Sequence, residues 1–136
     1  MRVLVDTNVL ISALLWPRSK PAAAVLHAAR HHELVLCDRN IAEMREVLKR
    51  KGPHTLADCE VFLAELAFDL VEAPERAEKL MDDPKDQPIL NAAMVSGVDV
   101  IITGDKHFLG LAMERPRAMT AAQYLESLAG DEEPVY

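Results

Sequence analysis

The sequence predicts an α/β fold with a central parallel sheet of four to five strands flanked by helices. Short apolar runs alternate along the chain with longer segments of helical periodicity. The runs are continuously apolar, as in strands that are buried on both faces of a parallel sheet. Half of the 136 residues are hydrophobic, which is enough to form a core. We expect one domain over residues 1–130 and a flexible acidic tail over residues 131–136.

Proline, glycine and a capping aspartate mark the boundaries of the predicted elements. Pro17 ends the first helix, and Pro21 opens the second, where its missing N–H costs nothing. Asp38 is the expected N-cap of a helix that Gly52 and Pro53 end. The predicted strands are residues 3–5, 34–37, 70–71 and 99–102. The predicted helices are residues 9–15, 22–31, 39–51, 56–68, 75–81, 89–96 and 121–128.

The charge of the chain is unevenly distributed. The net charge of −7 alone argues against a nucleic-acid-binding protein, because phosphate backbones favour basic surfaces. Residues 1–51 contain nine Lys and Arg against five Asp and Glu, whereas the rest contains six against seventeen. This asymmetry suggests two surfaces with different partners, and a chance distribution with an acidic tail is the alternative.

Nothing in the sequence indicates a membrane protein. No apolar run reaches the roughly 18 residues of a membrane span, and the first residues lack the pattern of a signal peptide. Cys37 and Cys59 are isolated and match no metal-binding spacing, so we expect both to be reduced. We therefore expect a cytoplasmic protein.

Acidic residues follow two predicted strands and begin two predicted helices. Asp6 directly follows the first strand, and Asp105 comes soon after the strand at 99–102. Because the carboxyl ends of parallel strands share one edge of a sheet, we expect both acids at that edge. Glu43, in the helix after the second strand, and Asp86, before the helix at 89–96, start from the same edge. Four carboxylates from four segments can therefore converge.

Each of these acids also has an ordinary structural interpretation. An aspartate after a strand is often a turn former or a helix cap, which applies above all to Asp86. Glu43 alone could belong to a solvated helix face. Clustered carboxylates repel each other, however, and a hard divalent cation with oxygen ligands is the usual reason for such a cluster. Two bound cations would activate a water molecule and stabilise the leaving oxygen in phosphodiester hydrolysis.

The ordered motifs resemble the PIN-domain family over about residues 2–128. The likeness is strongest to the toxin components of bacterial and archaeal toxin–antitoxin systems, such as VapC toxins. The resemblance rests on Asp6-Thr7-Asn8-Val9-Leu10, Glu43, Asp86-x-x-Ile89-x-x-Ala92 and Thr103-Gly104-Asp105.

The resemblance implies a fold, an activity and a set of site residues. It implies a PIN-like three-layer fold and cleavage of RNA with Mg²⁺ or Mn²⁺, and also homodimers and neutralisation by a small antitoxin protein. The metal-site acids by position are Asp6, Glu43, Asp86 and Asp105, with Asp83 as a spare acid near Asp86. Asn8 and Thr103 match the family's supporting polar positions among its catalytic residues.

Basic and apolar residues near the predicted active edge are candidates for binding partners. The preferred RNA contacts are Arg18, Lys20, Arg39 and Arg45, whereas Lys49-Arg50-Lys51 could grip phosphate or simply end a helix. We expect Leu14, Leu15 and Trp16 to contact a protein partner, and packing of Trp16 in the core is the alternative. The five histidines show no recognisable metal spacing.

Two other functions fit parts of the pattern. A haloacid-dehalogenase-type phosphatase also has Asp after its first strand, but it needs a second Asp two residues later, where this chain has Asn8. A catalytically idle PIN-like module that binds RNA or protein is the other alternative. The presence of all four acids argues against it, and metal-stimulated cleavage of RNA would separate the two.

Overall fold

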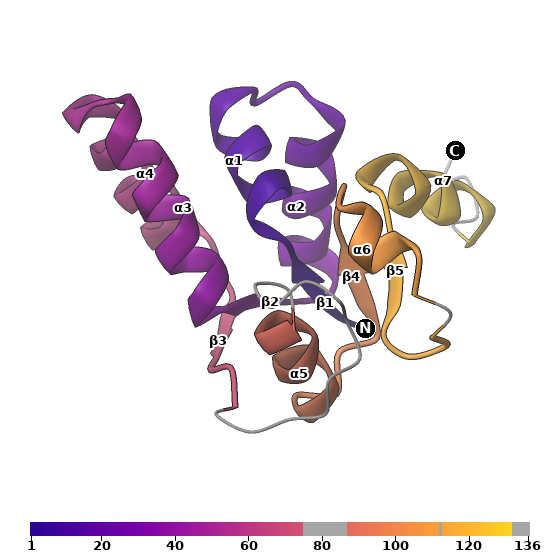
Figure 1. Ribbon diagram of the computed structural model, residues 1–136. Coiled ribbons are helices and arrows are strands. Elements are labelled where there is room, and N and C mark those ends of the chain that lie inside the picture. Colours follow the sequence, from indigo (N-terminus) through magenta and orange to yellow (C-terminus); the bar gives the residue numbers. More distant parts are fainter. Residues whose placement is uncertain (75–86, 112, 132–136) are drawn as a thin grey trace.

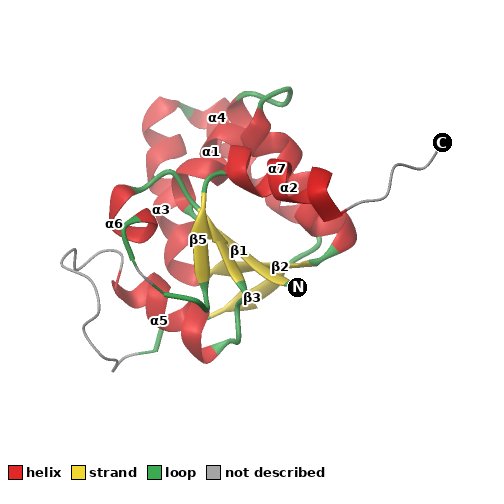
Figure 2. Ribbon diagram, turned by 90° about the vertical axis from the view of Figure 1, so that its right-hand side faces the viewer, coloured by secondary structure: helices red, strands yellow, loops and turns green. Residues whose placement is uncertain are grey.

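The computed structural model describes residues 1–74, 87–111 and 113–131, and shows a parallel sheet between two layers of helices (Figures 1 and 2). The strands are β1 Arg2–Val5, β2 Glu33–Cys37, β3 Asp69–Val71, β4 Val100–Ile102 and β5 Arg117–Met119. The helices are α1 Thr7–Leu15, α2 Lys20–His31, α3 Asp38–Lys51, α4 Pro53–Glu65, α5 Gln87–Val95, α6 Lys106–Leu109 and α7 Ala121–Asp131. The helix predicted over residues 75–81 lies outside the described residues.

The five strands run parallel in the order β3-β2-β1-β4-β5. β2 lies next to β1 toward one edge strand of the sheet, and β4 lies next to β1 toward the other edge strand. The order in which the chain adds strands therefore reverses at β1. In open parallel sheets, the carboxyl end of such a switch point is where ligands bind. Val5 of β1 pairs with Ile102 of β4, so the residues after these two strands emerge side by side.

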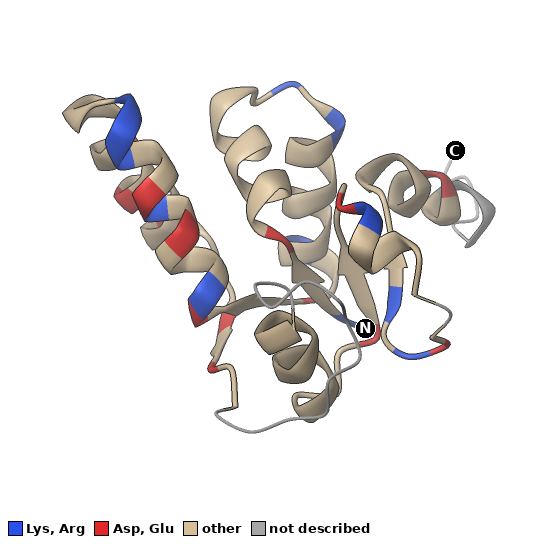
Figure 3. Ribbon diagram, viewed as in Figure 1, with Lys and Arg blue, Asp and Glu red and all other residues tan. Residues whose placement is uncertain are grey.

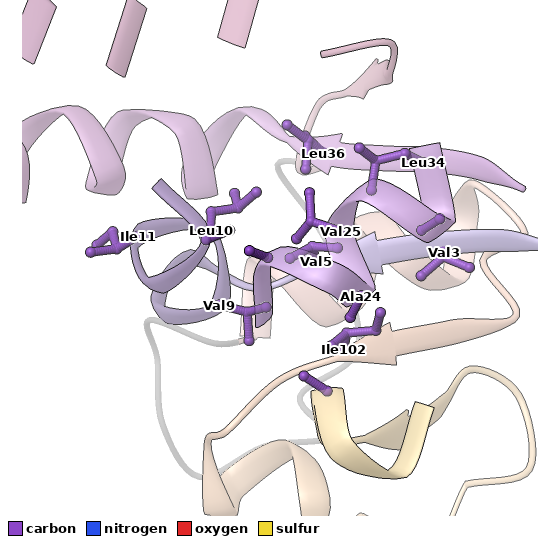
Figure 4. Packing of buried hydrophobic residues seen from close by; sticks show 14 of the residues in the cluster. Val3, Val5, Val9, Leu10, Ile11, Ala24, Val25, Leu34, Leu36 and Ile102 are labelled. Carbon is purple, nitrogen blue, oxygen red and sulfur yellow. The ribbon is translucent and has the colours of Figure 1, made fainter. Parts of the chain in front are cut away.

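Alternate residues of each strand pack into different layers. Val3 and Val5 of β1 point toward the cluster that includes α1, α2 and α7, whereas Leu4 joins the opposite cluster with Leu90 of α5 and Phe108 of α6. Figure 4 shows the first cluster around β1 and α1. Burying each such side chain stabilises the fold by about 1.5–3 kcal/mol. The predicted three-layer α/β fold is confirmed, since helices cover both faces of a five-stranded sheet.

Some element boundaries differ from the predicted ones for local reasons. Asp38 is the first residue of α3 rather than its N-cap, and its carboxylate accepts hydrogen bonds from the backbone N–H groups of Arg39 (2.8 Å) and Ala73 (3.1 Å). α4 begins directly at Pro53, because Gly52 separates α3 from α4 in a single residue. The φ of Gly52 is 130°, a conformation that residues with a side chain rarely adopt.

β5 and α6 are elements that the sequence did not predict. β5 has three residues, of which only Met119 is buried, and α6 is a single helical turn. Neither presents the continuous apolar run or the helical periodicity on which the prediction depends. In the described part of the chain, no helix has both the length and the apolar character to cross a membrane.

Candidate active site

Asp6 stands at the carboxyl end of β1, at the switch point of the sheet. It is also the N-cap of α1, where its Oδ1 accepts a hydrogen bond from the backbone N–H of Thr7 (2.9 Å). The backbone N–H of Asp6 donates to the carbonyl of Ile102 (2.9 Å), which holds β1 against β4 up to this residue. Only 5% of Asp6 is exposed, so its carboxylate is fixed by its surroundings rather than solvated.

Thr103 connects two of the predicted site acids. Its side chain is fully buried directly after β4, and its Oγ1 donates to Asp6 Oδ2 at 2.8 Å. The same Oγ1 accepts a hydrogen bond from the backbone N–H of Asp105 at 3.0 Å. One hydroxyl therefore orients Asp6 and fixes the backbone at Asp105. The structure thus brings Thr103, Asp6 and Asp105 together at one edge of the sheet.

Asp105 caps α6 as Asp6 caps α1. Its Oδ1 accepts hydrogen bonds from the backbone N–H of His107 and lies 2.8 Å from His107 Nδ1. No role for His107 could be assigned from the sequence, and the structure shows it as a direct neighbour of the Asp105 carboxylate. The Asp105 side chain remains 26% exposed, so one side of it is open to solvent or to a ligand.

Glu43 approaches the same edge from α3. Its side chain is exposed, and its Oε2 accepts a hydrogen bond from Thr7 Oγ1 (3.2 Å). Thr7 follows Asp6 in the chain and is buried, which ties Glu43 to the start of α1. Glu43, Asp6 and Asp105 therefore approach one another from three elements, as the order of the strands led us to expect.

Burial and neighbouring charge act together on Asp6. Burial raises the pKa of the Asp6 carboxyl, and the negative charges of Asp105 and Glu43 raise it further. Hydrogen bonds from Thr103 and from the Thr7 backbone oppose this effect by stabilising the carboxylate. A buried acid with a raised pKa and two acidic neighbours is typical of functional sites, including sites that bind a cation.

Asn8 lies apart from the acid cluster. It is exposed, and no hydrogen bond joins it to another side chain in the ranges that the structure describes. Asn8 lines a hollow of about 350 Å³ together with Lys20, Thr103 and Thr120. It therefore sits beside the site without supporting an acid. Asp86 and Asp83 lie outside the described residues.

Sequence reasoning missed Thr7 and Asn40. Asn40 has no exposed surface, and its Nδ2 donates to Asp6 Oδ1 (3.2 Å) and to Thr7 Oγ1 (3.0 Å). One signal could have revealed it: Asn40 shares the buried face of α3 with Ile41, Met44 and Leu48. A polar residue on an apolar helix face needs a buried hydrogen-bond partner.

The donor set of the site suits a hard divalent cation. Asp6, Glu43 and Asp105 offer only oxygen ligands, which Mg²⁺ and Mn²⁺ prefer. Among the residues that the structure describes, no lysine or arginine forms an ion pair with Asp6 or Glu43. Three His, Cys, Asp or Glu side chains arranged to hold a metal do not occur within the described ranges, which exclude Asp86.

The family model of the PIN domain matches residues 2–107 of the chain. The chain belongs to the PIN-domain family. The match extends from β1 into the first half of α6 and includes Asp6, Glu43, Asp86 and Asp105. It gives no support to the haloacid-dehalogenase alternative. No curated protein matches the chain in sequence.

Three solved structures share the fold of this PIN domain. VapBC2 from Rickettsia felis, bound to a DNA fragment from its promoter, has a TM-score of 0.69 at 12% identity, covering 88% of this chain and 98% of that one. VapC20 of Mycobacterium tuberculosis, a sarcin-ricin loop cleaving toxin, has a TM-score of 0.58 at 12% identity, covering 76% and 90%. PAE2754 from Pyrobaculum aerophilum has a TM-score of 0.61 at 20% identity, covering 96% of both chains. These likenesses establish a VapC-like PIN fold.

Proposed function

We propose that this PIN domain is a metal-dependent endoribonuclease that acts as the toxin of a toxin–antitoxin pair. The observation that carries the proposal is the buried Asp6 carboxylate, whose pKa is raised by burial and by the neighbouring charges of Asp105 and Glu43. PIN-domain membership and the sarcin-ricin loop cleavage of the similar VapC20 support RNA as the substrate.

The proposed metal site consists of Asp6, Glu43, Asp86 and Asp105, with Thr103 and Thr7 as hydrogen-bonding supports. Bound Mg²⁺ or Mn²⁺ would lower the pKa of an attacking water molecule and neutralise charge on the scissile phosphate. Asp6 stays fixed between Thr103 and the Thr7 backbone, so it keeps its position when a ligand arrives. Asp105 and Glu43, which are more exposed, face the solvent from which the substrate enters.

A basic path for RNA runs along α3. Arg39, Glu43 and Arg50 line one hollow of about 560 Å³, and Figure 3 shows basic residues toward both ends of α3 with acidic residues between them. Arg39 forms no ion pair with a residue that the structure describes, so its guanidinium can bind phosphate. Arg45, another predicted RNA contact, is held by both carboxylate oxygens of Glu60, at 2.7 and 3.2 Å. We therefore favour Arg39 over Arg45.

A small antitoxin is the proposed protein partner. Trp16, predicted to contact a partner, is 59% exposed at the end of α1, and Leu14 lines a nearby apolar hollow of about 400 Å³ with Leu26 and Val61. Asp58 and Glu65 lie at the same hollow, so a basic amphipathic helix fits its chemistry. A homodimer and a cytoplasmic location complete the proposal. Of the acidic tail expected at residues 131–136, Asp131 is the last residue of α7, and residues 132–136 lie outside the described residues.

The decisive test is cleavage of a mixed RNA pool by the purified protein with EDTA, Mg²⁺ or Mn²⁺. We expect fragments only with a divalent cation. Asp86→Asn should abolish cleavage, whereas Asp83→Asn should cleave as the wild type does. If the wild type binds RNA but never cleaves it with either cation, the protein is a binding module. If Asp83→Asn alone loses cleavage, Asp83 replaces Asp86 in the site.

A further inference from the structure

Asn40 is a buried amide at the centre of the acid cluster. It lies one turn before Glu43 on α3 and has no exposed surface. Its neighbours on the buried face of α3 are apolar, so an amide at this position is unfavourable unless its polar atoms find partners. The partners of Asn40 show what the amide does at this position.

Both N–H groups of the Asn40 amide are used within the site. Nδ2 donates to Asp6 Oδ1 at 3.2 Å and to Thr7 Oγ1 at 3.0 Å. Because Thr7 Oγ1 accepts from Asn40, its own proton is free to donate to Glu43 Oε2, which lies 3.2 Å away. One amide therefore contacts Asp6 directly and Glu43 through a single hydroxyl.

The Asn40 carbonyl oxygen, in contrast, has no hydrogen-bond partner among the residues that the structure describes. A reversed amide would bring this oxygen against the Asp6 carboxylate, where two acceptors repel each other, so Asp6 determines the orientation. A buried unpaired oxygen lowers the stability of a fold, and an apolar side chain at this position would avoid that cost. The benefit of Asn40 therefore lies in its two N–H groups.

We propose that Asn40 is a positioning residue that presets the spacing of Asp6 and Glu43 before a divalent cation binds. The inference rests on the proposed function, since it assigns these two acids to one metal site. Hydrogen bonds to metal-ligating carboxylates fix their orientation, and their loss typically weakens metal affinity or activity about 10–100-fold. Without the amide, Asp6 keeps its hydrogen bonds from Thr103 and the Thr7 backbone, but the donors that orient Asp6 Oδ1 and the Thr7 hydroxyl are lost.

Asn40→Leu tests this role, because it removes both donors while keeping the branching of the side chain. Met44→Leu, a buried substitution one turn further along α3, is the matched control. We expect calorimetric titration with Mn²⁺ to show a Kd for Asn40→Leu that is raised about 10–100-fold and a Kd for Met44→Leu equal to that of the wild type. RNA cleavage by Asn40→Leu should recover at saturating Mn²⁺. The melting temperature without metal should stay near that of the wild type, because the unpaired oxygen leaves together with the donors.

Two outcomes would overturn the role of Asn40: an unchanged Kd in Asn40→Leu, or an equal loss in Met44→Leu. If Asn40→Leu does not fold, Thr7→Val can be tested instead. It removes the hydroxyl that connects Asn40 with Glu43 and should still raise the Kd for Mn²⁺. An NMR experiment without metal separates this inference from the proposed function. The side-chain NH₂ protons of Asn40 should exchange slowly with water in the wild type, and fast exchange would refute the positioning role. Slow exchange in a protein that binds no Mn²⁺ would refute the proposed metal-dependent function alone.

Discussion

The acidic residues at the two edges of the sheet have different kinds of partner. At the amino edge, Arg2 Nη1 lies 3.0 Å from carboxylates of both Glu33 and Asp69, and Asp99 is paired with Arg115 at 2.9 Å. At the carboxyl edge, Asp6 and Glu43 contact hydroxyl and amide groups but no basic side chain among the described residues. Within the described residues, acids at the amino edge are thus paired with arginine, whereas Asp6 and Glu43 at the carboxyl edge are not.

The largest expected effect comes from removing charge at the carboxyl edge. Asp6→Asn keeps the shape of the side chain and its cap on α1 but should reduce RNA cleavage more than about 100-fold, beyond the usual loss for a supporting residue. At Mn²⁺ concentrations near 100 times Kd, the wild type should gain about 2.7 kcal/mol of stability and Asp6→Asn much less. Without metal, Asp6→Asn should melt at a higher temperature, because burial and two acidic neighbours disfavour the Asp6 carboxylate.

Thermal melts with and without Mn²⁺, together with one cleavage assay, measure these effects. The comparison of the two edges fails if Asp6→Asn lowers the metal-free melting temperature, since the carboxylate would then stabilise the fold by itself.

A smaller effect is expected for RNA affinity. Arg39→Gln should weaken RNA binding severalfold and reduce the slope of log K against log salt concentration by about 0.7, the value for one phosphate contact on a single strand. Arg45→Gln is the control, because Arg45 is already paired with Glu60. Fluorescence anisotropy at several salt concentrations gives both quantities. Equal losses of RNA affinity in the two variants would show that Arg45 binds RNA despite its ion pair with Glu60.

At the amino edge, stability should change rather than activity. Arg2→Met removes two partly exposed ion pairs and the hydrogen bond from Arg2 Nε to the carbonyl of Ser96 (2.9 Å). Ion pairs of this kind contribute about 0.2–1 kcal/mol each, so we expect a loss on the order of 1 kcal/mol, reduced at high salt. Urea unfolding measures this loss. Metal-stimulated RNA cleavage should be unchanged, and a loss of activity would connect the two edges.

The smallest expected effect is on the pH dependence of stability. Burial lowers the pKa of His32, and the nearby N-terminal ammonium group of Met1 and the rings of His27 and His31 lower it further. His32 is therefore favoured as the neutral form in the folded state, and its contribution to stability is present above about pH 6.5 and lost as the pH falls below that value. The pKa of Asp6 is raised, so its contribution has the opposite sign and metal-free stability is gained as Asp6 becomes protonated.

Metal-free melts from pH 7 to pH 5 compare these two contributions. His32→Gln should show a smaller fall in melting temperature than the wild type over this range, and Asp6→Asn should lack the gain in stability that accompanies protonation of Asp6. An identical pH profile for His32→Gln and the wild type would mean that folding does not lower the pKa of His32.

The strands and the edge that carries the acids could be predicted because they depend on local patterns. Continuous apolar runs marked β1, β2 and β4, and strand direction then placed Asp6 and Asp105 at one edge. Asn40 and Thr7 could not be assigned in this way, because their roles depend on the packing of α3 against the start of α1. Asn8, two residues after Asp6 and in the first turn of α1, is exposed and forms no hydrogen bond with an acid in the described part of the chain, so its supporting role stays a prediction.

Asp6 and Asp105 are helix caps as well as candidate ligands, so α1 and α6 stabilise both carboxylates in place without any ion. Folding and metal loading are then separate events, unlike in zinc fingers, where the chain folds only around its ion. A chelator should consequently leave a folded, silent protein that regains activity as soon as the ion returns. For an enzyme that degrades RNA in its own cell, such a reversible off state would be available without refolding, degradation or new synthesis.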